Sequence, residues 1–422
     1  MGIIGIIFIL GLCFLLSNNR KNINYRTIIV GLILQFSIAF FVLKTHIGKT
    51  IFAALGGGIQ KILNFATEGG NFVFGFLTDR PEKLVDVLGS GADFIFALTL
   101  IPVLIFVMVL VNILYYWGIM QRIILFLGKG MYRLMNITGA EAMSNIASAF
   151  IGQVEAQMLI QPHLKKMTLS QLLSSMSGSL ACISGGIMAV YIGMGVPAEY
   201  LLAASFMAAP GAIVVSKIIF PEENKTVTQD EFSLKYDKTA VNLIDSIAQG
   251  ACVGLKVSLN IIAMIIGLIA LIALFNYGLG LLGTFLVNVL HVPNTIGVLD
   301  IANLSLSGLL GVLFAGFAFL LGVPSHEIVT VGSLMGEKLV FNEFIAYLHM
   351  TGLETPLSSK SMIIASFALC GFANFGSIAM QIGGIGELEP SRRTDLAKLG
   401  YKALICGTLT SYISAAIAGL LL

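Results

Sequence analysis

Charged side chains are scarce in this chain of 422 residues. Lysine, arginine, aspartate and glutamate make up 11% of the sequence, whereas hydrophobic residues make up 57% and the mean hydropathy is +0.94. Soluble domains carry about 25% charged residues, so this composition excludes a soluble protein and indicates a polytopic membrane protein. The formal net charge is only +2 and the basic residues are dispersed, which argues against a nucleic-acid-binding surface.

Cysteines are also few, and no two of them have the spacing of a metal site. The five are Cys13, Cys182, Cys252, Cys370 and Cys406, each alone in apolar surroundings. This pattern predicts neither a disulfide framework nor a zinc site, and we expect the cysteines to be small packing residues. The sequence also lacks a nucleophile with its base and a cluster of metal ligands. We therefore expect no enzyme, no metal and no organic cofactor.

Basic residues between the apolar runs set the expected orientation. Spans are predicted at about residues 1–17, 27–43 and 94–118. The first connection holds three basic residues, and loops rich in lysine and arginine stay in the cytoplasm, so the N terminus is expected outside. Residues 44–93 carry too many charges for a span and are predicted to form interfacial helices and a loop. Residues 119–141 are expected to lie along the inner surface.

The second half of the chain continues this alternation. Residues 200–220 are predicted to span the membrane, and residues 221–238 to form a cytoplasmic connection. An amphipathic segment at 241–256 is expected before a long apolar stretch at 257–289, which leads outward. The last span, at 401–422, leaves the C terminus outside. The resulting prediction is an all-α protein of the cytoplasmic membrane with both termini outside.

Polar residues occur within segments that are otherwise suited to lipid. Gln153 and Glu155 lie in the middle of residues 142–164, and a charged side chain inside a bilayer costs at least ~2.5 kcal/mol, so Glu155 must face a partner, a substrate or water. Basic residues on both sides of this segment predict a re-entrant hairpin rather than a span. The next segment, 169–195, has serines and glycines at its centre, which predict either close helix packing or a break.

The same order occurs a second time. Residues 302–347 form an interrupted apolar region with Glu343 near its end, and residues 361–383 carry Asn374 and Ser377 at mid-depth. Hairpin, broken span and plain span therefore recur from opposite faces, an inverted repeat that is typical of secondary transporters. A channel would need rings of polar residues, which this pattern does not suggest. We expect four regions: residues 1–141 with the N-terminal spans, 142–220 with the first repeat, 221–300 with a loop and a scaffold span, and 301–422 with the second repeat.

Five motifs in this order resemble the concentrative nucleoside transporter family. They are Gly152-Gln-Val-Glu-Ala156, Leu321-Gly-Val-Pro324, Gly332-Ser-Leu334, Lys338 with Asn342-Glu-Phe-Ile-Ala-Tyr347, and Gly371-Phe-Ala-Asn-Phe-Gly-Ser377 with Gln381-Ile-Gly-Gly384. The resemblance covers nearly the whole chain. It implies eight transmembrane helices, two re-entrant hairpins, a homotrimer, and an elevator movement that imports nucleosides such as uridine.

The resemblance also implies which side chains bind the substrate. The expected base contacts are Gln153, Val154, Glu155 and Ile187, and the expected ribose contacts are Glu343, Phe372, Asn374 and Ser377. Amide and carboxylate groups suit the donors and acceptors of a base edge and the vicinal hydroxyls of a ribose. The family commonly has threonine at the position of Val154, so the preferred base stays open.

The coupling ion is inferred from two positions at which the sequence differs from the family. Its sodium ligands correspond to Ser148, Ile151, Cys182 and Ile183, but the family has asparagine and serine where this chain has Ser148 and Cys182. Sulfur is a poor ligand for a hard cation, so we favour proton coupling. Carboxyls removed from water hold protons more tightly, which makes Glu155 and Glu343 candidate proton carriers. Sodium coupling, or transport of another small polar solute, is the alternative.

Overall fold

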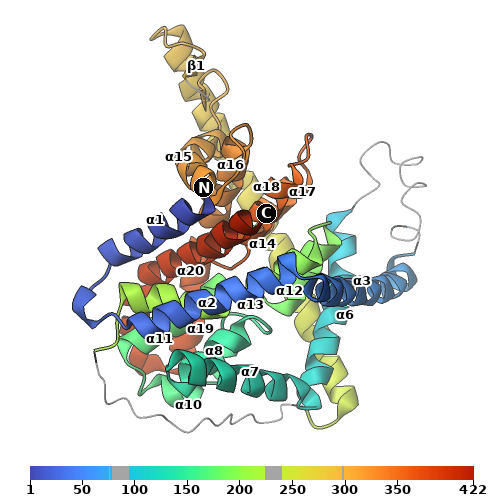
Figure 1. The fold of residues 1–422 in the computed structure, drawn as a ribbon. Helices are drawn as coiled ribbons and strands as arrows, with labels where there is room; N and C mark the ends of the chain where they lie inside the picture. Colours follow the sequence, from blue (N-terminus) through green and yellow to red (C-terminus); the bar gives the residue numbers. More distant parts are fainter. Residues whose placement is uncertain (76, 78–94, 224–239, 297–298) are drawn as a thin grey trace.

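The computed structural model describes residues 1–75, 77, 95–223, 240–296 and 299–422, and these are mostly helical (Figure 1). The one strand pair within them is a short antiparallel hairpin of β1 (Thr295–Ile296) and β2 (Leu299–Asp300). The helices gather into a main body, from which α14 reaches outward and carries the hairpin at its far end.

The N-terminal helices follow the predicted spans closely. They are α1 (Gly2–Leu15), η1 (Arg20–Asn22), α2 (Tyr25–Lys44), α3 (His46–Phe74), α6 (Phe96–Tyr116) and α7 (Ile119–Met135). Of residues 44–93, which were predicted to form interfacial helices and a loop, residues 46–74 form one helix, α3. Its buried residues recur every three or four positions, so α3 lies on the body along one face. Residues 76 and 78–93 are outside the described part.

The first predicted repeat contains several short helices and one long helix at its end. They are α8 (Gly139–Ser148), α9 (Glu155–Met158), α10 (Gln161–Leu164), α11 (Leu169–Ala181), α12 (Gly185–Gly193) and α13 (Ala198–Ile219). Capping boxes at Thr138 and Thr168 start α8 and α11. The segment predicted at 169–195 is broken at residues 182–184, where Ser184 caps the second piece. Of the two expectations for this segment, the break is therefore correct.

A single helix, α14 (Leu243–Asn288), connects the halves. The sequence predicted an amphipathic segment followed by a separate apolar stretch, and this was wrong, because the helix runs without interruption for 46 residues. It packs against α6 by close backbone approach. A Cβ placed on Gly250 would lie 2.7 Å from Cα of Val109, and one on Gly254 would lie 2.5 Å from Cα of Ile105. Small residues thus fix this helix pair.

The second predicted repeat also contains a broken helix followed by a long one. It comprises α15 (Leu306–Leu321), α16 (Ile328–Val340), α17 (Glu343–Thr351), α18 (Ser359–Leu369), α19 (Phe375–Leu388), η2 (Pro390–Arg392) and α20 (Arg393–Leu421). The helix predicted at 361–383 is broken at residues 370–374, and Asn374 caps its second piece. The two termini lie near each other, because α1 packs along α20 (Figure 1) and a Cβ on Gly2 would meet Ala416.

Burial separates the long helices into two groups. Six helical segments in the described part are long and apolar enough to cross a membrane, and α1, α15 and α18 are shorter apolar helices. The apolar windows of α13 and of residues 390–421 are 89% buried inside the protein, whereas those of α6 and α14 are only 17% buried. The core therefore lies around α13 and α20, and the α6 and α14 pair leaves most of its apolar surface exposed.

Candidate functional site

The two broken helices touch at their breaks. We call residues 182–184 the first break and residues 370–374 the second break. The backbone N–H of Phe372 donates to the carbonyl oxygen of Cys182 at 3.3 Å. Gly371 has φ +118°, and a Cβ on it would lie 2.6 Å from the carbonyl oxygen of Ala181, so this close approach requires glycine. The contact fixes the starts of α12 and α19 relative to each other.

Glu343 lies at the start of α17 and is only 5% exposed. Asn342 caps this helix by accepting a hydrogen bond from the N–H of Ile345. One carboxylate oxygen of Glu343 accepts from the hydroxyl of Tyr191 at 2.9 Å, and the other accepts from Nδ2 of Asn374 at 3.2 Å. The positive end of α17 also favours a carboxylate at this position. The buried carboxylate is thus held by donors from α12 and from the second break.

The side chain of Asn374 both caps α19 and binds Glu343. Its Oδ1 accepts from the backbone N–H of Ser377 at 2.8 Å and so caps α19, while its Nδ2 donates to Glu343. The hydroxyl of Ser377 is buried without a hydrogen-bond partner among the described residues, and Phe372 within the second break is half-buried. Buried polar atoms are nearly always bonded, so the unpartnered hydroxyl of Ser377 suits a bound ligand.

The predicted base contacts Gln153 and Val154 lie against the same helix, α19. Nε2 of Gln153 lies 3.6 Å from the sulfur of Met380, and its Oε1 is buried without a partner in the described part. The side chain of Val154 packs on Gly384, where any Cβ would meet its methyl groups. Both residue sets therefore border α19: the ribose set at its first turn, and Gln153 and Val154 one to two turns further along.

The other two predicted base contacts, Glu155 and Ile187, are less buried than Gln153. Glu155 begins α9 and is exposed, contrary to the burial assumed for a proton carrier, and it has no hydrogen-bond or ion-pair partner among the described residues. Its carboxylate lies over Gly152, where a side chain would clash with it. Ile187 is half-buried on α12, and its N–H donates to Ser184 at 3.5 Å. Glu155 is thus available to a ligand, whereas Glu343 is already bonded.

The residues predicted to hold the coupling ion have protein partners. The hydroxyl of Ser148 donates to the carbonyl of Ser144 at 2.7 Å and lies 2.9 Å from the hydroxyl of Ser179. The sulfur of Cys182 faces the carbonyl oxygen of Ser205 at 3.8 Å. Ile183 is fully buried, and the N–H of Ile151 bonds within its own turn to Ala147. In the described residues, no group of three or more His, Cys, Asp and Glu side chains could hold a metal.

Family models match the chain in succession. "Na+ dependent nucleoside transporter N-terminus" matches residues 4–77, "Nucleoside recognition" matches residues 97–198, and "Na+ dependent nucleoside transporter C-terminus" matches residues 200–419. An uncharacterized transporter of Bacillus subtilis, YutK, is 40% identical over 99% of this chain and 98% of its own length. The nucleoside permease NupC of Helicobacter pylori is 34% identical over 99% of this chain and 96% of its own.

A solved structure agrees with these relatives. CNTnw, in an inward-facing substrate-bound state, has a TM-score of 0.90 and 36% sequence identity, covering 100% of this chain and 97% of that one. The chain belongs to the concentrative nucleoside transporter family. The family prediction made from the five motifs is thereby confirmed. As a concentrative nucleoside transporter, the chain is an integral membrane protein, and its relatives are named as transporters and permeases rather than enzymes.

Tyr191 and Gln157 were missed by the sequence reasoning. Tyr191 is fully buried and binds the carboxylate of Glu343. Gln157, also fully buried, donates to Ser179 at 2.7 Å and accepts from Ser175 at 2.6 Å, so it ties α9 of this nucleoside transporter to α11. A signal existed for both, because a tyrosine or glutamine inside an apolar helix needs a polar partner.

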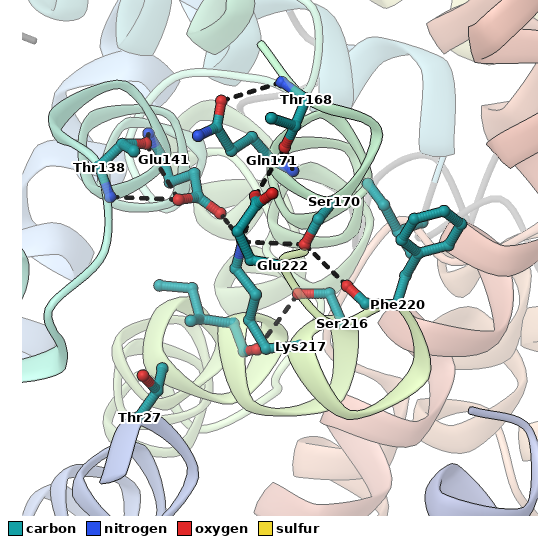
Figure 2. A network of polar contacts seen from close by, with 12 residues as sticks. Thr27, Thr138, Glu141, Thr168, Ser170, Gln171, Ser216, Lys217, Phe220 and Glu222 are labelled. Carbon is teal, nitrogen blue, oxygen red and sulfur yellow. Dashed lines mark hydrogen bonds and ion pairs between the residues drawn. The ribbon is translucent and has the colours of Figure 1, made fainter. Parts of the chain in front are cut away.

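A second polar network lies at the starts of α8 and α11 (Figure 2). The ammonium of Lys217, at the end of α13, lies 2.6 Å from the carboxylate of Glu141 and donates to Ser170 at 3.0 Å. The hydroxyl of Thr168 donates to Glu222 at 2.7 Å, and that carboxylate lies 3.8 Å from Lys217. The network therefore joins the starts of α8 and α11 to the end of α13, at a distance in sequence from the substrate contacts.

Proposed function

We propose that this transporter is an ion-coupled symporter that imports nucleosides, uridine and related compounds, across the cytoplasmic membrane. The observation that carries the proposal is the carboxylate of Glu343, which is buried at the start of α17 and oriented by Tyr191 of α12 and by Asn374, the cap of α19. An oriented carboxylate can accept from both vicinal hydroxyls of a ribose. A ligand without those hydroxyls would leave it poorly paired, which gives selectivity.

The groups at the other end of the proposed site bind the nucleobase. The unpartnered Oε1 of Gln153 and the exposed carboxylate of Glu155 both accept hydrogen bonds, and the amide of Gln153 also donates. A nucleobase edge offers both kinds of group. Val154 adds an apolar contact, and Ile187 and Phe372 supply half-buried apolar surface. These polar and apolar groups fit a nucleoside better than an amino acid or a free sugar.

The transport cycle is proposed in the form that the family resemblance implies. The protein has eight spans and two re-entrant hairpins in an inverted repeat, forms a homotrimer, and moves its substrate domain as an elevator. The mainly exposed apolar surface of α6 and α14 supports a static scaffold that packs against other subunits and lipid. The nearness of the termini supports their common location outside.

Protons are proposed as the coupling ion. The hydroxyl of Ser148 is engaged by Ser144 and Ser179, and Cys182 presents a sulfur, so the side chains offer a hard cation fewer oxygens than the asparagine and serine of the family would. The carboxyls of Glu155 and Glu343 are the protonatable groups of the site. The sodium alternative is supported by the description of the matching family model, and backbone carbonyls of Ile151 and Ile183 would serve sodium as well.

Binding of candidate solutes to the purified protein tests the substrate class. Isothermal titration calorimetry with uridine, adenosine, uracil, ribose, a neutral amino acid and glucose should give measurable affinity for the two nucleosides and at least about a hundredfold weaker binding of the isolated base and sugar. Equal or tighter binding of an amino acid or glucose would overturn the nucleoside assignment.

A further inference from the structure

Lys338 is buried beside the second break. It lies on α16, is 1% exposed, and its ammonium donates to the carbonyls of Ala368 at 2.8 Å and Cys370 at 3.2 Å and to the hydroxyl of Ser411 at 3.2 Å. Ser411 in turn donates to Cys370 at 2.6 Å. Three donors therefore meet three acceptors, and within the described residues no carboxylate forms an ion pair with this lysine.

Burying this charge is energetically unfavourable unless other groups stabilise the ammonium. Burial of an ammonium without a carboxylate is unfavourable, and an apolar side chain of similar length would fill the same volume at less cost. The compensation comes from α18, which ends at Leu369, because the last carbonyls of a helix lack intrahelical partners and carry its negative end. Lys338 thus neutralises the end of α18 where the chain enters the second break.

The first break differs in this respect. It follows α11 in the same way, yet no lysine or arginine of the described residues donates to a carbonyl at the end of α11 or within the break. Its neighbours are the neutral side chains of Ser148, Ser179 and Gln157. The buried lysine of the first half, Lys217, is paired with Glu141 at the opposite end of α11 (Figure 2).

We propose that Lys338 is a built-in cation that positions the ribose clamp. This inference rests on the proposed nucleoside site. Lys338 belongs to the helix that leads into Glu343, and its ammonium binds the first carbonyl of the segment that ends in Asn374. The two segments are joined a second time by the hydrogen bond from Asn374 to Glu343. Lys338 therefore fixes the distance between Glu343 and Asn374, without touching the nucleoside, and the second break needs no mobile cation.

The test compares how well the protein recognises ribose hydroxyls. Titration calorimetry measures the affinities of uridine and 2′,3′-dideoxyuridine for the wild type and for Lys338→Met, at the same pH and sodium concentration. The wild type should prefer uridine strongly, and Lys338→Met should lower this preference by about tenfold or more, because the carboxylate is no longer held in register. A merely structural role would weaken both ligands equally, and that result would overturn the proposal.

A milder matched pair covers the case in which Lys338→Met does not fold. Ser411→Ala removes one partner of the ammonium, and Ser414→Ala removes an equally buried serine of the same helix that accepts from Gln35 instead. Ser411→Ala should lower the preference for uridine by about threefold, and Ser414→Ala should leave it unchanged. Identical preferences in the two variants would refute the role of Lys338. Failure of the wild type to bind any nucleoside would instead remove the proposed function, and the inference with it.

Discussion

The two breaks have a similar architecture but differ in their charged surroundings. Each follows a helix that is buried nearly throughout, each is followed by a helix whose first turn is capped by a side chain, and the two touch through Phe372 and Cys182. The second break is flanked by a buried lysine and a buried glutamate. The first break is flanked by serines, a cysteine and a glutamine, with the exposed Glu155 some distance along the hairpin.

This difference suggests that the two halves have different roles, ribose binding in the second and ion binding in the first. The second half carries its own cation and holds a carboxylate ready for the ribose. In the described residues the first break has no fixed positive charge, so a positive charge there would come from solution, either as protons on carboxyls or as a metal cation on backbone carbonyls. The following substitutions test this difference between the charged second break and the neutral first break.

The largest effect is expected for Glu343→Gln. Glutamine has one acceptor oxygen and an NH₂ group, so it cannot accept from both Tyr191 and Asn374 and has no charge for the ribose hydroxyls. Uridine uptake into proteoliposomes should fall by more than about a hundredfold. The exposed Glu354→Gln on the following loop is the control and should transport normally. Wild-type uptake by Glu343→Gln would remove the ribose-clamp role.

Tyr191→Phe should have an intermediate effect. It deletes one hydroxyl that orients Glu343 and keeps the ring contacts with Phe344 and Tyr347. Loss of one hydrogen bond to a charged group should weaken uridine binding by about tenfold. Calorimetry with Tyr412→Phe as control separates this from a general effect of losing a buried tyrosine hydroxyl, since Tyr412 is equally buried and its hydroxyl has no partner in the described residues. Equal losses in both variants would contradict the specific role of Tyr191.

The fold could be predicted best where polar residues interrupt apolar runs. Glycines and polar residues at the centre of long apolar segments marked the positions of both breaks, because glycine holds a helix weakly. In the first segment the same residues were equally compatible with close helix packing. The continuity of α14 was not predictable, since a change from amphipathic to apolar composition does not itself end a helix. Likewise, charges along α3 excluded a span but could not tell one helix from two.

The site was predictable in its members but not in its contacts. Gln153, Glu343 and Asn374 carry the family motifs and stand out as polar residues in apolar surroundings. The hydrogen bond between Tyr191 and Glu343 joins residues 152 positions apart, and no local pattern indicates which glutamate a buried tyrosine meets. The three acceptors of Lys338 are even less predictable, because two of them are backbone carbonyls that any residue type supplies.

A gain of sodium dependence is expected from altering the first break. The double variant Ser148→Asn, Cys182→Ser introduces the two side chains that the family resemblance expects, and both present oxygens to a hard cation. Sodium at constant pH should then raise uridine uptake about fivefold over the wild-type response, in line with one added ligand interaction. Ser205→Ala, which keeps the backbone carbonyl that Cys182 faces and removes only the hydroxyl beside the sulfur of Cys370, serves as a neighbouring control. No change in sodium response would argue against an ion at the first break.

The smallest effect is expected at the base end. Val154→Thr keeps the shape that packs against Gly384 and adds a hydroxyl, so the ranking of nucleosides should shift by a few-fold with little loss of total affinity. Gln153→Ala should instead weaken all nucleosides and flatten their ranking, because both hydrogen-bonding groups of the amide are lost. Competition for radiolabelled uridine uptake by a panel of nucleosides measures both. An unchanged ranking in the two variants would contradict the base assignment.

The most direct test of ion-coupled nucleoside symport is accumulation by purified protein in proteoliposomes. Uridine uptake is followed under an inward proton gradient without sodium, under an inward sodium gradient at equal pH on both sides, and with neither gradient, with Glu343→Gln as the blank. The account predicts accumulation above the outside concentration under the proton gradient alone, and only equilibration in the other two conditions. Accumulation that follows the sodium gradient and ignores the proton gradient would contradict proton coupling and show that the first break binds sodium with its remaining oxygens.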